Sequence, residues 1–305
     1  MYIAKKSLLA AALALGAMAS AHADSFASAL LDINHFRLLH SGGGAYSTAD
    51  FTTLTGTNDA HATGELNGVF ANGAQSFGIL SGTNPDVPHQ CVGACFPKVE
   101  NDFTPFLFPP PGPGTFGYAD QRLTGSSISI AGSPADAHAN TRADAALMMN
   151  GTASGNSDVG TSTTFAFVLG ASDTMTVAFD GTPFSQAWVS AGSGPTTNAN
   201  ARLSWSMQIV NLTTGGTVFA YAPIELNALS NVSRTDGAPG TTTYNPGTAF
   251  FSATTPLLAA GNTYQITIQH NTLANALQAV PEPASLAIFG LGLLGLSAFT
   301  RRRQS

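Results

Sequence analysis

The stretch Leu203-Ser204-Trp205-Ser206-Met207-Gln208-Ile209 decides how this chain folds. Large apolar side chains occupy every second position, and serine or glutamine fills the positions between them. Because successive side chains of a β-strand point to opposite faces, this pattern predicts a strand with one buried and one exposed face. Such a strand belongs to a sheet whose apolar face packs on a second layer.

Other segments repeat the same period. Residues 264–269 alternate apolar and polar side chains after a Gly-Asn turn. Two further strands are predicted at 165–169 and 175–179, and we expect Asp180-Gly181 to end the second one as a turn. Strands of this spacing, separated by Gly, Asn and Pro, predict an all-β fold, an antiparallel, jelly-roll-like β-sandwich.

Residues 135–149 carry a strand pattern made of small side chains. Alanine, threonine, leucine and methionine occupy the odd positions, and charged or polar side chains occupy the even positions from 136 to 144. The high helix propensity of alanine favours a helix instead. Strand and helix both stay open for this segment.

Composition supports a protein built mainly of β-sheet. Lys and Glu are scarce, while Thr, Ser, Gly, Asn and Ala abound, which favours strands and turns over surface helices. Between Asp24 and Pro283, six basic side chains stand against seventeen acidic ones, a formal charge of −11. Nucleic acid and anionic membrane surfaces are therefore poor partners. This length of chain allows one large β domain or two small ones.

Cys91 and Cys95 are the only cysteines. In an oxidising compartment such a pair predicts a small-loop disulfide. A zinc site is disfavoured because two thiolates do not complete a tetrahedral ligand set. The pair lies in residues 84–118, which hold eight prolines and are therefore predicted to form a long surface loop.

The N-terminus has the features of a secretory signal. Lys5-Lys6 precede an apolar run over residues 7–19, and Ala21-His22-Ala23 supplies the small-x-small cleavage pattern. We expect cleavage after Ala23, so that residues 1–23 direct export through the Sec machinery. Residues 24–279 then form the exported domain.

The C-terminus combines three features within residues 280–305. Val280-Pro281-Glu282-Pro283 is held extended by its prolines. The seventeen uncharged residues 284–300 would span roughly 25 Å as a helix, just enough for a single transmembrane helix. Arg301, Arg302 and Arg303 then stay on the cytoplasmic side, and everything before Pro281 faces away from the cytoplasm.

This order of motif, short apolar helix and arginine cluster resembles the PEP-CTERM sorting signal of Gram-negative bacteria. The resemblance implies that an exosortase is a partner, that the chain passes through the inner membrane, and that it is cut near Pro281 to Pro283. It further implies an exosortase-dependent surface protein at the cell surface or in the extracellular polysaccharide matrix, with a link to biofilm. Weaker similarity at 165–184 and 259–270 points the same way. A tail anchor that is never cut is the alternative.

One tetrapeptide occurs twice, as Asp59-Ala60-His61-Ala62 and as Asp136-Ala137-His138-Ala139. On a strand, the Asp and His of each copy would share a face. Each pair could supply two ligands to a metal site, or a base and the carboxylate that orients it. A solvated polar face explains the pattern equally well, so no metal-binding residue is assigned.

Calcium is the one cofactor that the sequence suggests. Oxygen ligands crowd the expected turns at Asn58-Asp59 and Asn156-Ser157-Asp158, although the spacing of an EF-hand is missing. Ordinary turn residues are the alternative.

For catalysis, the chain contains none of the common nucleophile, zinc-protease, phosphate-loop or dinucleotide motifs. We therefore expect a noncatalytic protein without a cleft and assign no catalytic residue. Two alternatives remain. A carbohydrate-binding module would need an exposed aromatic platform, with candidates Trp188, Tyr118 and Tyr244. A secreted polysaccharide-active enzyme would need two convergent carboxylates, which scattered acids such as Asp173, Asp180 and Glu225 could supply only by chance.

Overall fold

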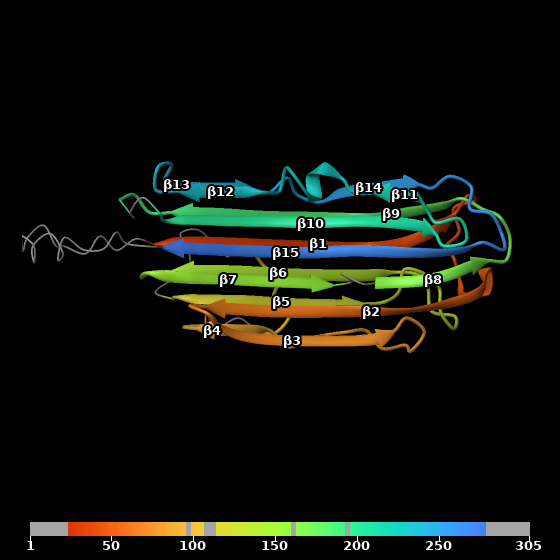
Figure 1. Cartoon of the computed structure of the whole chain (residues 1–305), viewed down its shortest axis with the longest axis horizontal. Helices are drawn as coiled ribbons and strands as arrows, with labels where there is room; N and C mark the ends of the chain where they lie inside the picture. The colour runs from red at the N-terminus through yellow and green to blue at the C-terminus, as the bar shows by residue number, and fades with distance from the viewer. Residues whose placement is uncertain (1–23, 96–98, 107–113, 160–162, 193–195, 279–305) are drawn as a thin grey trace, which may run out of the picture.

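The computed structural model describes residues 24–95, 99–106, 114–159, 163–192 and 196–278. Nearly all regular structure in these residues is β-strand, and two antiparallel sheets lie face to face (Figure 1). Two short 3-10 helices, η1 (Thr48–Asp50) and η2 (Ile224–Leu226), complete the described elements. The predicted all-β, antiparallel class is confirmed.

The first sheet has seven strands in the order β13-β9-β1-β6-β5-β4, and β14 also pairs with β9. Edge strands are short and the central ones long, which limits the open sheet edge. The strands are β1 (Ser25–His40), β4 (Gln90–Gly93), β5 (Phe116–Thr124), β6 (Ala137–Leu147), β9 (Met175–Val189), β13 (Gly240–Tyr244) and β14 (Ala249–Thr254).

The second sheet has eight strands in the order β11-β10-β15-β7-β2-β3. In addition, β12 pairs with β10, and β8 pairs with both β15 and β2. The strands are β2 (Phe51–Leu66), β3 (Val69–Gly78), β7 (Gly151–Val159), β8 (Thr163–Leu169), β10 (Asn198–Asn211), β11 (Gly216–Tyr221), β12 (Val232–Thr235) and β15 (Thr263–Gln278).

The first and last strands bring the two ends of the described chain together. β1 packs on β15 across the sandwich, and β6 packs on β7. Ser25 pairs with Leu147 at the end of β6, and Gln278 pairs with Gly151 at the start of β7. Because the short connection from β6 to β7 joins these partners, both chain ends lie at the same end of the sandwich (Figure 1).

The core changes in character along the length of the sandwich. Near the chain ends it consists mainly of buried alanines, whereas the far half is filled by large rings. The alanines are Ala27, Ala29, Ala143, Ala145, Ala153, Ala199, Ala201, Ala274 and Ala276, and the large side chains are Phe36, Phe51, Phe165, Phe167, Phe179, Trp205 and Tyr264.

Glycines let the two sheets approach closely in the alanine-rich half. A Cβ atom at Gly155 of β7 would overlap the Tyr118 carbonyl oxygen of β5 and lie 2.8 Å from the Asp144 amide nitrogen of β6. At Gly64 of β2, a Cβ would lie 2.6 Å from the Gly117 carbonyl oxygen. Glycine at these two positions therefore lets the sheets come close together.

Several sequence predictions are confirmed. The segment 203–209 lies within β10, with its apolar side chains buried, and 264–269 lies within β15. Residues 165–169 lie in β8. The ambiguous segment 135–149 contains strand β6, so the period of two outweighs the helix propensity of its alanines.

The predicted turn at Asp180-Gly181 is wrong, because β9 continues through it to Val189. Gly181 pairs with Ile33 of β1 on one side and with Ala249 of β14 on the other. The Phe251 ring also covers it, since a Cβ at Gly181 would lie 2.9 Å from a carbon of that ring. Pairing on both sides holds this Asp-Gly pair in a strand, and glycine makes room for the ring.

The expectation of a plain surface loop over residues 84–118 is also corrected. The segment contains the edge strand β4 and the beginning of β5. Val87 and Phe106 are buried. Prolines flank β4 but leave it able to pair along one edge, which agrees with their exclusion from central strands.

None of the helices in the described part of the chain has the length and apolar character needed to cross a membrane. The predicted transmembrane helix at 284–300 and the predicted signal peptide at 1–23 lie outside the described residues.

Candidate functional sites

The predicted sorting and export residues also fall outside the described ranges. These are Ala21, Ala23, Val280, Pro281, Glu282, Pro283, Arg301, Arg302 and Arg303. What the structure does place is their points of attachment, because β1 begins at Ser25 and β15 ends at Gln278. Both segments therefore join the sandwich at its alanine-rich end.

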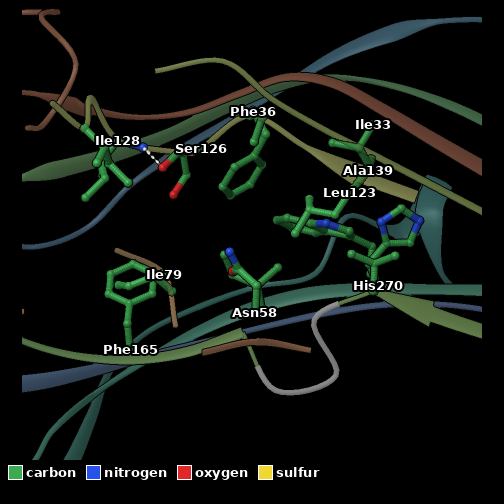
Figure 2. Close-up of a pocket in the computed structure, with 17 residues that line it drawn as sticks. Ile33, Phe36, Asn58, Ile79, Leu123, Ser126, Ile128, Ala139, Phe165 and His270 are labelled. Carbon is green, nitrogen blue, oxygen red and sulfur yellow. Dashed lines mark hydrogen bonds between the residues drawn. The ribbon is translucent and has the colours of Figure 1, made fainter. Parts of the chain in front are cut away.

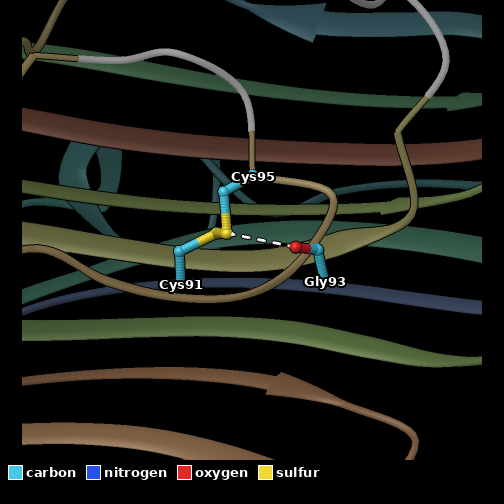
Figure 3. Close-up of a disulfide and its surroundings, with 3 residues drawn as sticks. All are labelled: Cys91, Gly93 and Cys95. Carbon is cyan, nitrogen blue, oxygen red and sulfur yellow. Dashed lines mark hydrogen bonds between the residues drawn. A yellow bond between two sulfur atoms is a disulfide. The ribbon is translucent and has the colours of Figure 1, made fainter.

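The predicted disulfide is confirmed. Cys91 and Cys95 are joined, with their Cα atoms 6.0 Å apart (Figure 3). Cys91 lies on β4 opposite Tyr118, and the Cys95 amide donates to the Gly93 carbonyl oxygen at 2.9 Å. The bridge closes a tight turn at the edge of the first sheet.

Beneath the proline-rich segment lies a buried charge cluster that the sequence did not reveal. Arg142 and Asp144 of β6 are fully buried and form an ion pair. The Nη1 atom of Arg142 donates to the carbonyl oxygens of Asp102, at 2.9 Å, and Thr104, at 2.7 Å. The Phe106 ring centroid lies 4.4 Å from the guanidinium carbon, a cation–π contact. This cluster clamps residues 102–106 onto the sheet.

Asp120 of β5 forms the second part of this clamp. Its Oδ2 atom accepts hydrogen bonds from the Asn101 amide, at 2.9 Å, and from the Tyr118 hydroxyl, at 3.2 Å. Burial, together with the charge of Glu100, raises the pKa of Asp120 to about 7. Burial and the Asp120 charge likewise raise the pKa of Tyr118. These two groups with raised pKa values are thus enclosed under residues 99–106, which suits a structural clamp.

The two Asp-Ala-His-Ala copies have different surroundings. In the second copy, Asp136 and His138 share a face as predicted, with Nε2 of His138 3.2 Å from Oδ2 of Asp136. His35 of β1 joins them. In the first copy, His61 instead contacts Asp158 of β7, and Asp59 accepts a hydrogen bond from Ser76.

The suggested calcium turns are strands. Asn58-Asp59 lies within β2, and residues 156–158 lie within β7. Asn156 accepts a hydrogen bond from Asn271 at 2.7 Å, and the carboxylate of Asp158 contacts His61 at 2.9 Å. These oxygens are engaged across the sheet, so the turn geometry assumed for calcium binding is wrong.

The scattered carboxylates lie in separate settings. Asp173 lies 2.7 Å from Nδ1 of His40, whose Nε2 lies 3.2 Å from Asp50. Partial burial acts against ionisation of Asp173, but hydrogen bonds from Ser41 and His40 hold its pKa at about 2. With both ring nitrogens facing carboxylates, His40 links two segments at the aromatic end. Asp180 lies in β9 and Glu225 in η2.

The aromatic candidates do not form an exposed platform. Tyr118 is buried among Phe26, Phe106 and Phe116, and Trp188 packs partly buried against that cluster. Tyr244 packs partly buried against the main core. All three rings therefore pack in or against the core instead of forming a binding surface.

We expected a chain without a cleft, but a cavity lies between the two sheets. The cavity measures about 70 Å³, and apolar side chains such as Phe36, Leu123 and Phe165 line most of it (Figure 2). His270 of β15 also lines it, fully buried, with Nε2 2.9 Å from the Thr141 hydroxyl. Burial lowers the pKa of His270 to about 3, so the ring is neutral at pH 7. The sequence could not show this cavity, because its walls come from strands far apart in the chain.

Comparison with known proteins identifies one region. Residues 279–303 match the family model of the PEP-CTERM protein-sorting motif. The motif marks an exosortase-sorted, exported surface protein, as the C-terminal sequence predicted. No curated protein and no solved structure matches the chain.

Proposed function

We propose that this chain is a noncatalytic exported protein, cut by an exosortase near Pro281 to Pro283 and retained at the cell surface or in the extracellular polysaccharide matrix of a Gram-negative bacterium. The observation that carries the proposal is the sorting motif at residues 279–303. Before processing, the protein would be held in the inner membrane, with Arg301 to Arg303 on the cytoplasmic side.

The arrangement of the chain ends supports this route. Ser25 and Gln278 lie at the same end of the sandwich, so the export signal and the sorting segment leave from one place. The aromatic end, with the loop that follows β1, then points away from the membrane during processing. A rigid domain tethered at one end leaves both outer sheet faces free for contacts.

The outer face of the second sheet is suited to weak contacts with polysaccharide. Polar side chains of β10 and β15 stand directly opposite one another: Ser204 faces Asn271, Ser206 faces Gln269 and Gln208 faces Thr267. Hydroxyl and amide groups both donate and accept hydrogen bonds with sugars and water. Many copies in a matrix would turn weak single contacts into retention, since multivalency raises avidity by roughly 10² to 10⁴.

A glycan-binding screen of the purified full chain, including the matrix polysaccharide of the source cell, tests this function. We expect dissociation constants of about 1 mM or weaker for single glycans, no hydrolysis products, and altered matrix or surface properties after deletion of the gene. Micromolar binding of one glycan that is lost in Trp188→Ala would place the protein among carbohydrate-binding modules. Glycan hydrolysis would make it an enzyme.

A further inference from the structure

A β-bulge in β1 turns His35 toward β6. The residues of β1 that join the main core occupy odd positions from Ala27 to Ile33 and even positions from Phe36 to Leu38, so the alternation changes phase between Ile33 and Phe36. The pairing of β1 with both β6 and β9 shifts register at this point. His35 has φ = 55°, in the left-handed region that non-glycine residues seldom adopt. Bulges of this kind re-aim a side chain.

The bulge completes a cluster of three side chains. Nδ1 of His35 lies 2.9 Å from Oδ1 of Asp136, and Nε2 of His138 lies 3.2 Å from Oδ2 of the same carboxylate. One nitrogen or oxygen from each residue lies within 4.8 Å of the others. The cluster thus holds two imidazoles and one carboxylate on the outer face of the first sheet.

Asn34 fixes the orientation of His138. Nδ1 of His138 lies 2.7 Å from Oδ1 of Asn34, and an amide oxygen only accepts, so Nδ1 must donate. In the neutral ring, Nε2 then carries a lone pair aimed at the Asp136 carboxylate. Two electron-rich atoms at this distance need a proton or a metal ion between them.

We propose that His35, Asp136 and His138 form a binding site for a divalent transition metal ion, with Zn²⁺ as the best fit. Imidazole nitrogen suits zinc, whereas calcium and magnesium prefer oxygen ligands alone. The hydrogen bond from His138 to Asn34 supplies the outer support that metal-bound histidines usually have.

The separations come near those of such an ion. Zinc lies about 2.0–2.2 Å from nitrogen and oxygen ligands, so tetrahedral ligands stand about 3.3 Å apart. The contacts of His35 with Oδ1 and of His138 with Oδ2 are 2.9 and 3.2 Å long. One ligand atom of each residue lies within 4.8 Å of the others, so the three must draw together around the ion. The side chains are between 31% and 55% exposed, which leaves the fourth position open to water.

The surrounding face has charges of both signs. Asp180 stands opposite Asn34 in β9, and Asp32 stands opposite Asn140 in β6. Arg122 stands opposite the same Asn140 on β5. Arg37 of β1 is exposed on the same face, opposite Ala178. Two carboxylates therefore stand against two guanidinium groups, and the surrounding charge neither favours nor opposes a cation.

Isothermal titration of the full chain, purified in mild detergent, with ZnCl₂ tests the proposal. We expect one zinc ion per chain, and roughly 100-fold weaker binding or more after His138→Gln or Asp136→Asn, because each removes a ligand. His35→Asn should act in the same way, and asparagine tolerates the positive φ at this position. Asn34→Ala should weaken binding about 10- to 100-fold, because it removes only the support of His138.

The first Asp-Ala-His-Ala copy provides the matched control. His61 contacts Asp158 without a second histidine, so His61→Gln should leave zinc binding unchanged. Melting temperatures of all variants establish that they are folded. The proposal is overturned if the chain takes up no zinc, or if any one of the three ligand variants binds zinc as tightly as the parent. It is also overturned if His61→Gln weakens zinc binding as much as His138→Gln does, or if Ca²⁺ at the same concentration displaces the zinc.

Discussion

Gly155→Ala tests the close approach of the two sheets. The added methyl group would overlap the Tyr118 carbonyl oxygen and lie 2.8 Å from the Asp144 amide nitrogen, where ordinary contact begins at about 3.4 Å. Both neighbours are backbone atoms of the opposite sheet and cannot rotate away. The sheets must therefore separate locally, and the buried alanines beside them lose contact.

Overpacking of a core typically destabilises by about 1–3 kcal/mol, and we expect at least the upper value here because rigid backbone opposes the new atom. Replacing glycine with alanine would by itself stabilise by about 0.4–1 kcal/mol through the unfolded chain. A loss of about 3 kcal/mol should lower the melting temperature by roughly 6–12 °C in a chain of this size.

Urea unfolding of the full chain, followed by the fluorescence of buried Trp205, measures this effect. Gly44→Ala is the matched control, because a Cβ there meets nothing within 4 Å. The control should stay within about 0.5 kcal/mol of the parent. If Gly155→Ala also stayed within that range, the inferred close contact between the sheets would be refuted.

Three further outcomes are expected. The raised pKa of Asp120 means that protonation of this carboxyl stabilises the native state. The free energy of unfolding should therefore fall by up to about 4 kcal/mol as pH rises from the ordinary pKa of 3.8 through about 7. In urea unfolding, Asp120→Asn should make the free energy of unfolding depend less steeply on pH over this range. A steeper loss below pH 3.8 than above it would contradict this sign. Alkylation of the unreduced chain should find no free thiol at Cys91 or Cys95, and two alkylated cysteines would contradict the bridge. Cys91→Ser should still fold, because the small closed loop adds little stability. The same variant should be cleaved faster by protease between residues 84 and 106. Phe106→Ala should remove the ring over Arg142 and also speed proteolysis of this segment, and cleavage at the parent rate would argue against the clamp.

The sequence predicts the regular part of the sandwich well, because burial there follows a period of two. Residues 203–209 and 264–269 each have one apolar and one polar face, and each becomes a half-buried strand. The disulfide between Cys91 and Cys95 follows from local spacing and was also predictable.

Features that depend on distant segments could not be predicted in this way. The even positions of β6 from 138 to 144 carry polar groups, yet Arg142 and Asp144 are buried because the proline-rich segment folds over them. Asp180-Gly181 has the composition of a turn, but strands on both sides hold it extended.

The histidine cluster was only half visible. Asp136 and His138 were recognised as a pair on one face, while His35 enters from a strand about one hundred residues earlier in the chain. The signal that could have found it is the change of phase between Ile33 and Phe36, which indicates a bulge.

The sorting account is tested most directly by the intact mass of the protein recovered from the surface of its native host. The account predicts a chain that starts at Asp24, ends near Pro281 to Pro283 and lacks Arg301 to Arg303. A mature surface form that still carries those three arginines would contradict it.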